Sequence, residues 1–462
     1  MKKIFIILAA VALIAPAAVA FASEPAAKSV KVEKQSHFKF YGFIRNYFVF
    51  DSRDNKAGTK DLFYYLPKDE SLNAKGEDVN ANPSFRFLAI TSRLGVDVKD
   101  YQIGKTKVGA KVETDFYCMN GNVAVLRLRQ AYATLAWDGL GNDGKQSTSV
   151  KIGQAWHPLA ADQPYVIDLE TGTPFNPFSR TPMVMLDHNF SEHFTLTGGF
   201  IWQMQYLSTG PNGASDNYIK YGCTPEFYAG VTLKSNSGFL GRAGVDVLSI
   251  KPRWRDGSGS KVSDRITTAN PYVYAQYVTR DFSINAKVVY ASAGEHINML
   301  SGYGVSKIND DGSREYTPLH STASYLSVKY GRKLQVQGMI GYMKNLGTND
   351  DKGLYSDTEI GARPGYRGKA YTSSNYLYLS SNGYSNLNSL VRVTPTVIYN
   401  LGKLSFGLEY DITAAQYGKY PVAKVDGKDE VMQVVNSHNG LVDDGLHWVT
   451  NHRLLGMVKF TF

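Results

Sequence analysis

Cysteine and long apolar runs are the scarcest features of this chain of 462 residues. Beyond residue 22, no apolar stretch approaches the roughly 18 residues that a membrane-spanning helix needs, which argues against a helical membrane protein. Sustained helical periodicity is also hard to find. The two cysteines, Cys118 and Cys223, both lie far from the apolar N-terminus, which argues against a lipoprotein anchor.

The N-terminus has the pattern of an exported protein. "MKKIFIILAAVALIAPAAVAFAS" joins two lysines to an apolar run that ends in the small-x-small triplet Ala20-Phe21-Ala22. We therefore expect residues 1–22 to be a signal peptide and residues 23–36 a short polar periplasmic segment. Removal of the two lysines lowers the formal charge from +9 to about +7. A basic exported protein need not bind nucleic acid, and we expect no such partner; an anionic solute or lipopolysaccharide would suit the charge equally well.

What the chain has in abundance is alternation of apolar and polar residues over about ten positions. In "KLSFGLEYDIT" one face carries Phe406 and Leu408, while the other carries Glu409 and Asp411. Charges in a soluble core would need partners, whereas charges facing a water-filled lumen would not. Together with 43 glycines, 31 tyrosines and 22 phenylalanines, the pattern predicts an all-β protein, a transmembrane antiparallel β-barrel.

About sixteen such segments can be placed between residues 37 and 462, and an even number is typical of single-chain bacterial barrels. Short and long connections alternate between them, which predicts short periplasmic turns and long outer loops. The connection 118–122 is the exception, since it should be an outer loop and is short; in a trimer, a low outer loop can sit beside the threefold contact. The predicted strands are 37–50, 84–99, 105–117, 123–137, 148–155, 183–190, 193–207, 224–235, 239–250, 270–279, 282–293, 321–331, 333–345, 388–400, 402–415 and 448–462.

The last predicted strand ends in aromatic residues. In "HWVTNHRLLGMVKFTF", Leu454, Phe460 and Phe462 share the face that we expect to meet lipid, with the phenylalanines at the interfacial girdle. This strand should close the barrel against the first one, leaving no free edge. It also resembles the signal that outer-membrane assembly machinery reads. We therefore expect a multi-pass barrel in the outer membrane of a Gram-negative bacterium, surrounded by lipid and lipopolysaccharide.

Basic residues gather on one expected sector of the lumen. In "LRLRQAYATLAW", Arg127 and Arg129 share a face and two leucines share the other. A pore wall of one sign concentrates counter-ions, so this sector is expected to select anions. The alternative is that these side chains form structural bridges with Glu113, Asp115 and Asp97, and both can hold together. The predicted pore-lining residues are Arg93, Lys111, Arg127, Arg129 and Lys151.

A proline-rich connection, residues 156–182, follows that sector. "WHPLAADQPYVIDLETGTPFNPFSRTP" is the third long outer loop, and in sixteen-strand porins this loop folds into the lumen and narrows it. Irregular backbone is tolerated at membrane depth where it lines a water-filled cavity. Asp162, Asp168 and Glu170 would then face the basic wall across the constriction. The alternative is a loop that packs outside, on a neighbouring subunit.

The stretch 91–190 resembles the DcaP-like porin family. The matching pieces are "TSRLGVDVK", "KVGAKVETDFY", "LRLRQAYATL" and "VKIGQAWHPLAAD", and the opening strand "FKFYGFIRNYFVFD" fits as well. The resemblance implies a trimeric sixteen-strand porin that admits small, mainly anionic solutes, with Arg127 and Arg129 lining the pore. Some relatives have a long N-terminal extension, for which residues 23–36 are too short. Beyond residue 190 only the barrel pattern matches, so the specificity of the outer loops does not carry over.

Signals for catalysis and metal binding are weak, and we expect neither an enzyme nor a cofactor. Ser437 beside His438 lacks an orienting acid, and four further histidines show no ligand spacing. Acidic pairs such as Asp310-Asp311 are better explained as solvated loops. The two cysteines should lie on strands five apart, which disfavours a disulfide between them. The four histidines are His157, His188, His193 and His320.

The sequence therefore favours a porin for passive diffusion of small hydrophilic, preferentially anionic solutes, working as a homotrimer. A structural or ligand-binding barrel with an occluded lumen is the alternative, with loops 346–387 and 416–447 as receptors, since their composition of Tyr, Asn, Ser and Gly suits recognition. An active transporter is disfavoured because it would need a plug domain and about 22 strands.

Overall fold

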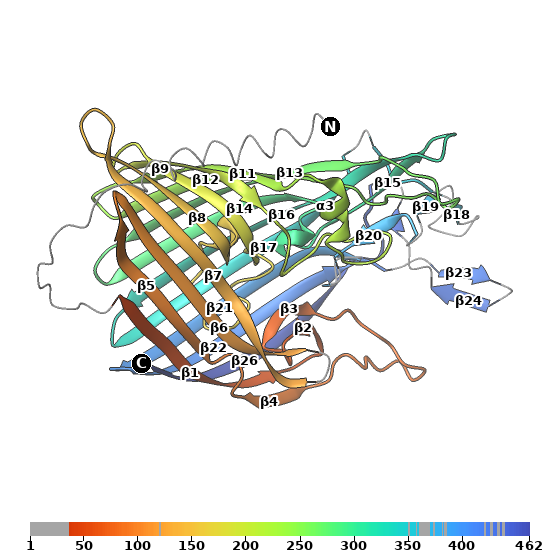
Figure 1. Ribbon diagram of the computed structural model, residues 1–462. Coiled ribbons are helices and arrows are strands. Elements are labelled where there is room, and N and C mark those ends of the chain that lie inside the picture. Colours follow the sequence, from red (N-terminus) through yellow and green to blue (C-terminus); the bar gives the residue numbers. More distant parts are fainter. Residues whose placement is uncertain are drawn as a thin grey trace, which may run out of the picture.

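The structure, a computed structural model, forms a closed antiparallel barrel of sixteen strands (Figure 1). It describes residues 37–119, 122–349, 352–356, 358–359, 370–372, 375–380, 382, 386–419, 422–425, 428–431, 435–436 and 439–462. The barrel strands are β1 (Phe38–Asp51), β5 (Arg93–Ile103), β6 (Thr106–Met119), β7 (Asn122–Leu140), β8 (Gln146–Trp156), β9 (Arg180–Asn189), β10 (Phe194–Ile201), β11 (Glu226–Lys234), β12 (Phe239–Ile250), β13 (Ile266–Val278), β14 (Phe282–Ser292), β16 (Arg314–Gly331), β17 (Leu334–Gly347), β21 (Leu387–Leu401), β22 (Leu404–Tyr417) and β26 (His447–Thr461).

Closure is made by the first and last strands, as predicted. β26 pairs with β1 in a register that runs from Phe43 opposite Thr461 to Asp51 opposite Arg453. On the other side, β1 pairs with β5, and each further barrel strand pairs with the next one in sequence. The prediction of an all-β antiparallel barrel is confirmed, because every predicted strand overlaps a strand of the barrel.

Alternation puts apolar side chains outside and polar ones inside. Along β26, Trp448 and Leu454 are exposed on the outer face, whereas Asn451 and Arg453 are fully buried inside. Phe460 and Phe462, predicted to face lipid, are each 45% exposed. The same alternation holds along β22, where Leu408 points outward. Each barrel strand can therefore present lipid with an apolar row and the lumen with a polar one.

One predicted strand is broken in two. Residues 84–99 were expected to be continuous, but the structure splits the segment into β4 (Ser84–Leu88) and β5, and both pieces pair with β1. The break contains Thr91, whose φ of 79° lies in the left-handed region. Its backbone N–H is bonded to the carbonyl of Phe116 and its hydroxyl to Arg45 inside the lumen. These bonds hold the chain in a conformation that a regular strand could not adopt.

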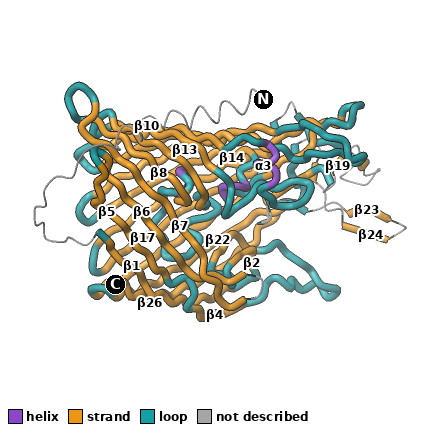
Figure 2. Tube along the Cα trace, in the orientation of Figure 1, coloured by secondary structure: helices purple, strands orange, loops and turns teal. Residues whose placement is uncertain are grey.

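The connections differ at the two ends of the barrel (Figure 2). Tight turns gather at the end that carries the start of β1 and the end of β26, and the long loops gather at the other. The long loops hold short elements of their own. These are β2 (Asn55–Gly58), β3 (Phe63–Pro67), η1 (Pro158–Ala160), α3 (Asn217–Gly222), η2 (Glu295–Ile297), β15 (Gly302–Ile308), β18 (Thr358–Glu359), β19 (Ala370–Thr372), β20 (Leu377–Leu379), β23 (Val422–Val425), β24 (Lys428–Val431) and β25 (Val435–Asn436).

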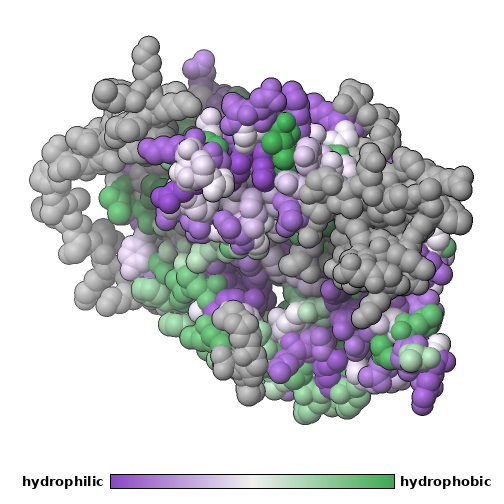
Figure 3. Space-filling model, turned by 90° about the vertical axis from the view of Figure 1, so that its right-hand side faces the viewer, coloured by the Kyte–Doolittle hydropathy of each residue, from purple (hydrophilic) through white to green (hydrophobic). Residues whose placement is uncertain are grey.

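Viewed onto the long-loop end, the described residues are mostly hydrophilic, with hydrophobic residues gathered toward the lower flank (Figure 3). No helix among the described residues is long and apolar enough to cross a membrane. The expected signal peptide and the segment 23–36 lie outside the described residues, as do residues 120–121 of the short outer connection. Loops 346–387 and 416–447 are described only in part.

The barrel interior contains an apolar core to which loops and barrel strands both contribute. The hairpin of β2 and β3 contributes Phe63 and Leu66, and the connection between β8 and β9 contributes Leu159, Ile167 and Phe175. All five side chains are buried, Phe63 at 6% exposure and the others below 9%. Two loops that are distant in sequence therefore pack against each other inside the lumen.

Candidate functional site

The connection between β8 and β9, residues 157–179, enters the lumen and is called loop 3 below. Lys287 of β14 holds its two arms together: the buried ammonium donates to the carbonyl of Leu159 at 2.8 Å and to the side-chain oxygen of Asn176 at 2.7 Å. Tyr325 of β16 donates to the carbonyl of Asp162 at 3.1 Å. These bonds fix the first arm of loop 3 to one side of the barrel wall.

The middle of loop 3 is fixed to another part of the wall, formed by β22 and β1. The carboxylate of Glu409 on β22 accepts hydrogen bonds from the backbone N–H groups of Ile167 at 2.7 Å and Asp168 at 2.9 Å. Tyr47 of β1 donates to the carbonyl of Ile167 at 2.6 Å. Loop 3 therefore spans the lumen and divides it, and the polar backbone that it exposes is bonded to the wall.

The three acids of loop 3 are each paired with an arginine. Asp168 accepts from Arg453 of β26 at 2.7 Å, and Glu170 accepts from Arg392 of β21 at 3.1 Å. Burial and the neighbouring Asp168 raise the pKa of Glu170 above its usual range. The two arginines, Arg453 and Arg392, lie on β26 and β21. They are therefore not part of the predicted basic wall on β5 to β8, which the sequence analysis expected these acids to face. The third pair joins Asp162 to Arg242 of β12.

A cavity of about 510 Å³ remains between loop 3 and the wall, and we call it the basic cavity. Its lining contains a single carboxylate, Asp168, which is paired with Arg453. The barrel strands that form its wall are β1, β5, β7, β8, β16, β17, β21, β22 and β26. Its basic lining residues are Arg45, Arg93, Arg127, Arg129, Lys329 and Lys459.

Arg127 and Arg129 line the basic cavity and also form salt bridges. Arg127 donates twice to Asp115, at 2.9 and 3.0 Å, and Arg129 donates to Glu113 at 2.8 Å and to Asp115 at 2.6 Å. The side chain of Arg127 remains 22% exposed, while that of Arg129 is 3% exposed. Arg93 completes the group, 3.6 Å from Glu113. Three cations thus share two carboxylates, so the group keeps an excess positive charge.

The two predicted lysines lie apart from the basic cavity. Lys111 is bound to Asp97 at 2.8 Å and to the hydroxyl of Tyr41 at 2.9 Å. Lys151 lines a second cavity of about 290 Å³, enclosed by β8 to β13 and the start of loop 3. That cavity also contains Lys234 and Asp187. The five predicted residues are therefore not stacked along one cavity: the three arginines line the basic cavity, Lys151 lines the second, and Lys111 lines neither of these two.

Three residues of the basic cavity were missed from the sequence: Arg45, Lys329 and Lys459. Within the described parts of the chain, none of them forms an ion pair. Arg45 and Lys459 are opposite each other on β1 and β26, and Arg45 donates to the hydroxyl of Thr91 at 3.1 Å. Their inward position follows from alternation along each strand, but their proximity depends on the register between the first and last strands.

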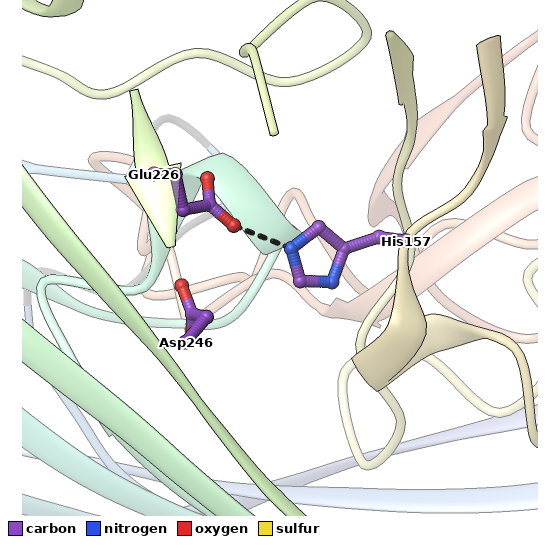
Figure 4. A group of neighbouring side chains, drawn as sticks. All are labelled: His157, Glu226 and Asp246. Carbon is purple, nitrogen blue, oxygen red and sulfur yellow. Dashed lines mark hydrogen bonds and ion pairs between the residues drawn. The ribbon is translucent and has the colours of Figure 1, made fainter. Parts of the chain in front are cut away.

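A buried cluster of imidazoles and carboxylates lies behind the first arm of loop 3 (Figure 4). His157 contacts Glu226 at 2.5 Å, and His296 of η2 contacts Asp246 at 2.9 Å. Burial opposes the charge on His296, but Glu226 and Asp246 hold its pKa up to about 9. Burial raises the pKa of the neighbouring Glu295 to about 7. This cluster was not foreseen, since nothing in the spacing of these residues links them.

The cysteines Cys118 and Cys223, both among the described residues, are not joined by a disulfide. Cys118 is half-buried at the end of β6, and Cys223 is exposed just after α3.

No family model matches the chain, and no curated protein sequence matches it. Among solved structures, the outer membrane channel DcaP of Acinetobacter baumannii is similar over 92% of this chain and 97% of its own, with 16% identity and a TM-score of 0.59. An anion-selective porin from Comamonas acidovorans is similar over 92% and 99%, with 10% identity and a TM-score of 0.48. The trimer form of OmpT of Vibrio cholerae covers 92% and 99%, with 12% identity and a TM-score of 0.45.

The likeness to DcaP shows the fold. Together with the closed barrel and its apolar outer face, it identifies the chain as an outer-membrane β-barrel. The resemblance to DcaP-like porins that the sequence indicated is confirmed for this fold.

Proposed function

We propose that this protein is a porin through which small hydrophilic solutes diffuse passively, with a preference for anions. The observation that carries the proposal is the composition of the basic cavity, where six basic side chains and one paired carboxylate surround about 510 Å³ of space beside loop 3. A narrow passage with a wall of one sign raises the local concentration of counter-ions and repels ions of its own sign. Anions are therefore the favoured solutes.

The excess charge is concentrated on three residues. Arg127 and Arg129 are largely compensated by Asp115 and Glu113, whereas Arg45, Lys329 and Lys459 lack an ion-pair partner among the residues described. A compensated cation contributes little to the potential at a distance, because its field is opposed by that of its partner. The uncompensated residues should thus set most of the selectivity.

Reversal potentials in planar bilayers under a salt gradient test this proposal. The double variant Lys329→Gln with Lys459→Gln should lower the preference for anions, and the change should be larger at low salt because the Debye length is about 30 Å at 0.01 M and about 10 Å at 0.1 M. Lys307→Gln is the matched control, since Lys307 lies in an outer loop, is exposed and is 3.8 Å from Glu315. An unchanged reversal potential in the double variant would contradict a selective basic cavity. An absence of conductance steps in the wild type would favour the occluded barrel instead.

We further propose that the protein assembles as a homotrimer. An apolar hollow of about 470 Å³ lies beside the break between β4 and β5. Phe87, Ile90, Phe116 and Ala124 line it, and Phe85 nearby is 68% exposed. A hollow of this kind suits an apolar side chain from a second copy of the chain. Light scattering in several mild detergents should give three times the mass of one chain, and a monomer in all of them would contradict the proposal.

A further inference from the structure

Four side chains from four elements converge behind the first arm of loop 3. His157 opens loop 3, Glu226 begins β11, Asp246 lies on β12, and His296 lies in η2. The Nε2 atom of His157 is 2.5 Å from Glu226, and the Nε2 atom of His296 is 2.9 Å from Asp246 and 3.7 Å from Glu226. Figure 4 shows His157, Glu226 and Asp246 pointing toward one another, and their ligand atoms lie within 4.8 Å of each other.

These groups are sealed from water, and His296 is the one cation that the described residues place beside both carboxylates. None of the four side chains is more than 2% exposed. No lysine or arginine of the described chain is bonded to either carboxylate, and one oxygen of Asp246 has no hydrogen-bond partner. The carboxylate of Glu295 adds a third negative group next to His296, and one of its oxygens is also unpartnered. A protonated His296 offsets only one of these negative charges, and the remaining buried negative charge is costly, so the site favours a further positive charge.

We propose that His157, His296, Glu226 and Asp246 bind one first-row transition-metal dication of the Zn²⁺ class. Two imidazoles and two carboxylates form a donor set that suits such ions, whereas Ca²⁺ and Mg²⁺ prefer oxygen ligands alone. Ligand atoms around a tetrahedral Zn²⁺ lie about 3.3 Å apart, and three of the six ligand pairs, at 2.5, 2.9 and 3.7 Å, bracket that value. His296 lies outside the set of three whose ligand atoms are all within 4.8 Å of one another, so it would have to move toward His157 to complete the site. The two charges of the ion balance the two carboxylates.

Binding of the ion changes which imidazole nitrogens carry protons and releases protons from the site. The Nδ1 atom of His157 accepts from the backbone N–H of Leu159 at 3.2 Å, so Nε2 carries the proton that faces Glu226. Coordination through Nε2 moves that proton to Nδ1 and gives up the bond to Leu159. Imidazolium protons elsewhere in the site leave to solvent when the ion enters. The bond that is lost is a long one, and the ion supplies stronger attraction to both carboxylates in return.

A bound ion would fasten loop 3 to its surroundings. It would join the first residue of loop 3 to β11, β12 and η2, and η2 already holds the last part of the loop, because the backbone N–H of Phe178 donates to the carbonyl of Ile297 at 2.9 Å. The ion would therefore have a structural role: it would stabilise the position of loop 3 in the lumen. This role does not depend on which solutes pass through the barrel.

The full-length protein, purified in detergent and freed of metal by a chelator, provides the test. Titration with Co²⁺ should give the intense visible bands of a four-coordinate ion at one equivalent per chain, and Zn²⁺ should displace it. In Glu226→Gln with Asp246→Asn the affinity should fall more than about 100-fold, beyond the loss expected for an outer partner. His296→Gln should behave similarly. His188→Gln is the matched control, because His188 lies on β9 and is bonded to Thr148.

Each result decides the matter. A folded wild type that binds no Co²⁺, or binds it with the weak bands of a six-coordinate ion, would overturn the proposal without any variant. Equal binding by wild type and the carboxylate variant would place the ion elsewhere and would overturn it too. Heat-modifiable migration on gels verifies that each barrel is folded, so loss of binding with normal migration supports the site.

Discussion

The lumen of this barrel contains two charged regions that differ in what covers them. At the anchor of loop 3, Arg392 and Arg453 are fully buried, as are the carboxylates that they bind. In the basic cavity, Arg127 is 22% exposed, and Arg45 and Lys459 are half-buried without an ion pair among the residues described. Strand β26 supplies both regions, since Arg453 and Lys459 lie on its inward face.

The difference shows that burial decides what a lumen charge does. Where loop 3 covers the wall, a charge is desolvated, and it is stable only with partners that satisfy its hydrogen bonds. Where loop 3 leaves space, water solvates the charge, and its field reaches a passing solute. The same strand, with the same alternation, can therefore supply a structural residue and a functional residue six positions apart.

The largest effect is expected from removing an anchor charge. Arg453→Met leaves Asp168 buried without its cation and leaves Asp51 only its 3.3 Å contact with Arg86, and breaking such a buried pair costs about 3–5 kcal/mol of unfolding free energy. Lys459→Met, on the same face of β26, should cost much less, because Lys459 has no ion-pair partner among the described residues. Denaturant unfolding of the refolded barrels measures both. Equal losses of unfolding free energy in the two variants would show that the buried charge and the half-buried charge contribute equally to stability, which would contradict the comparison.

A smaller effect is expected where loop 3 packs against a glycine. A Cβ added at Gly341 of β17 would lie 2.4 Å from the Phe175 ring, so Gly341→Ala must displace loop 3, at a cost of about 1–3 kcal/mol. Single-channel conductance should change, because the constriction moves. Gly456→Ala on β26 is the control, since the nearest atom to its Cβ would be 3.7 Å away. Unchanged conductance in the first variant would mean that loop 3 does not limit the current.

Much of the barrel was predictable, because alternation is a local property. The inward position of Glu409 and Asp411 and the outward position of Leu408 follow from a period of two along one strand. The entry of loop 3 into the lumen was suggested by its place as the third long loop. The break at Thr91 was missed, since its hydroxyl and N–H bonds involve Arg45 and Phe116, on other strands.

Pairing between distant segments was not predictable. The bonds that Glu409 accepts from loop 3 join residues 242 positions apart, and His157 meets Glu226 across 69 positions. Lys459 was visible on the inward face of its strand, but its place beside Arg45 requires the register of closure. Charge pairs in a lumen depend on which side chains face each other across water or a loop, and alternation along one strand does not contain that information.

The basic cavity contains both a paired cation, Arg127, and an unpaired one, Lys459, so their effects on anion preference can be compared directly. Lys459→Gln should reduce the anion preference more than Arg127→Gln, because removing Arg127 leaves Asp115 still bound to Arg129. Each variant removes one positive charge, so a simple count of charges predicts equal shifts. Reversal potentials at low salt, recorded under the same gradient, distinguish the two. A larger shift for Arg127→Gln would show that pairing does not screen its charge from the solute.

The smallest effect, with the opposite sign, is expected from Asp115→Asn. Asp115 is fully buried and binds Arg127 and Arg129 at 2.9 and 2.6 Å, so neutralising it uncovers positive charge and should raise the anion preference. The shift should be smaller than that of Lys459→Gln, since both arginines keep most of their surface away from the cavity. Asp97→Asn is the matched control: it frees Lys111, which does not line the basic cavity, and should leave the reversal potential unchanged. A fall in anion preference for Asp115→Asn in a folded barrel would mean that the arginines swing out of the cavity once unpaired, and that their bridges hold them in place for selection.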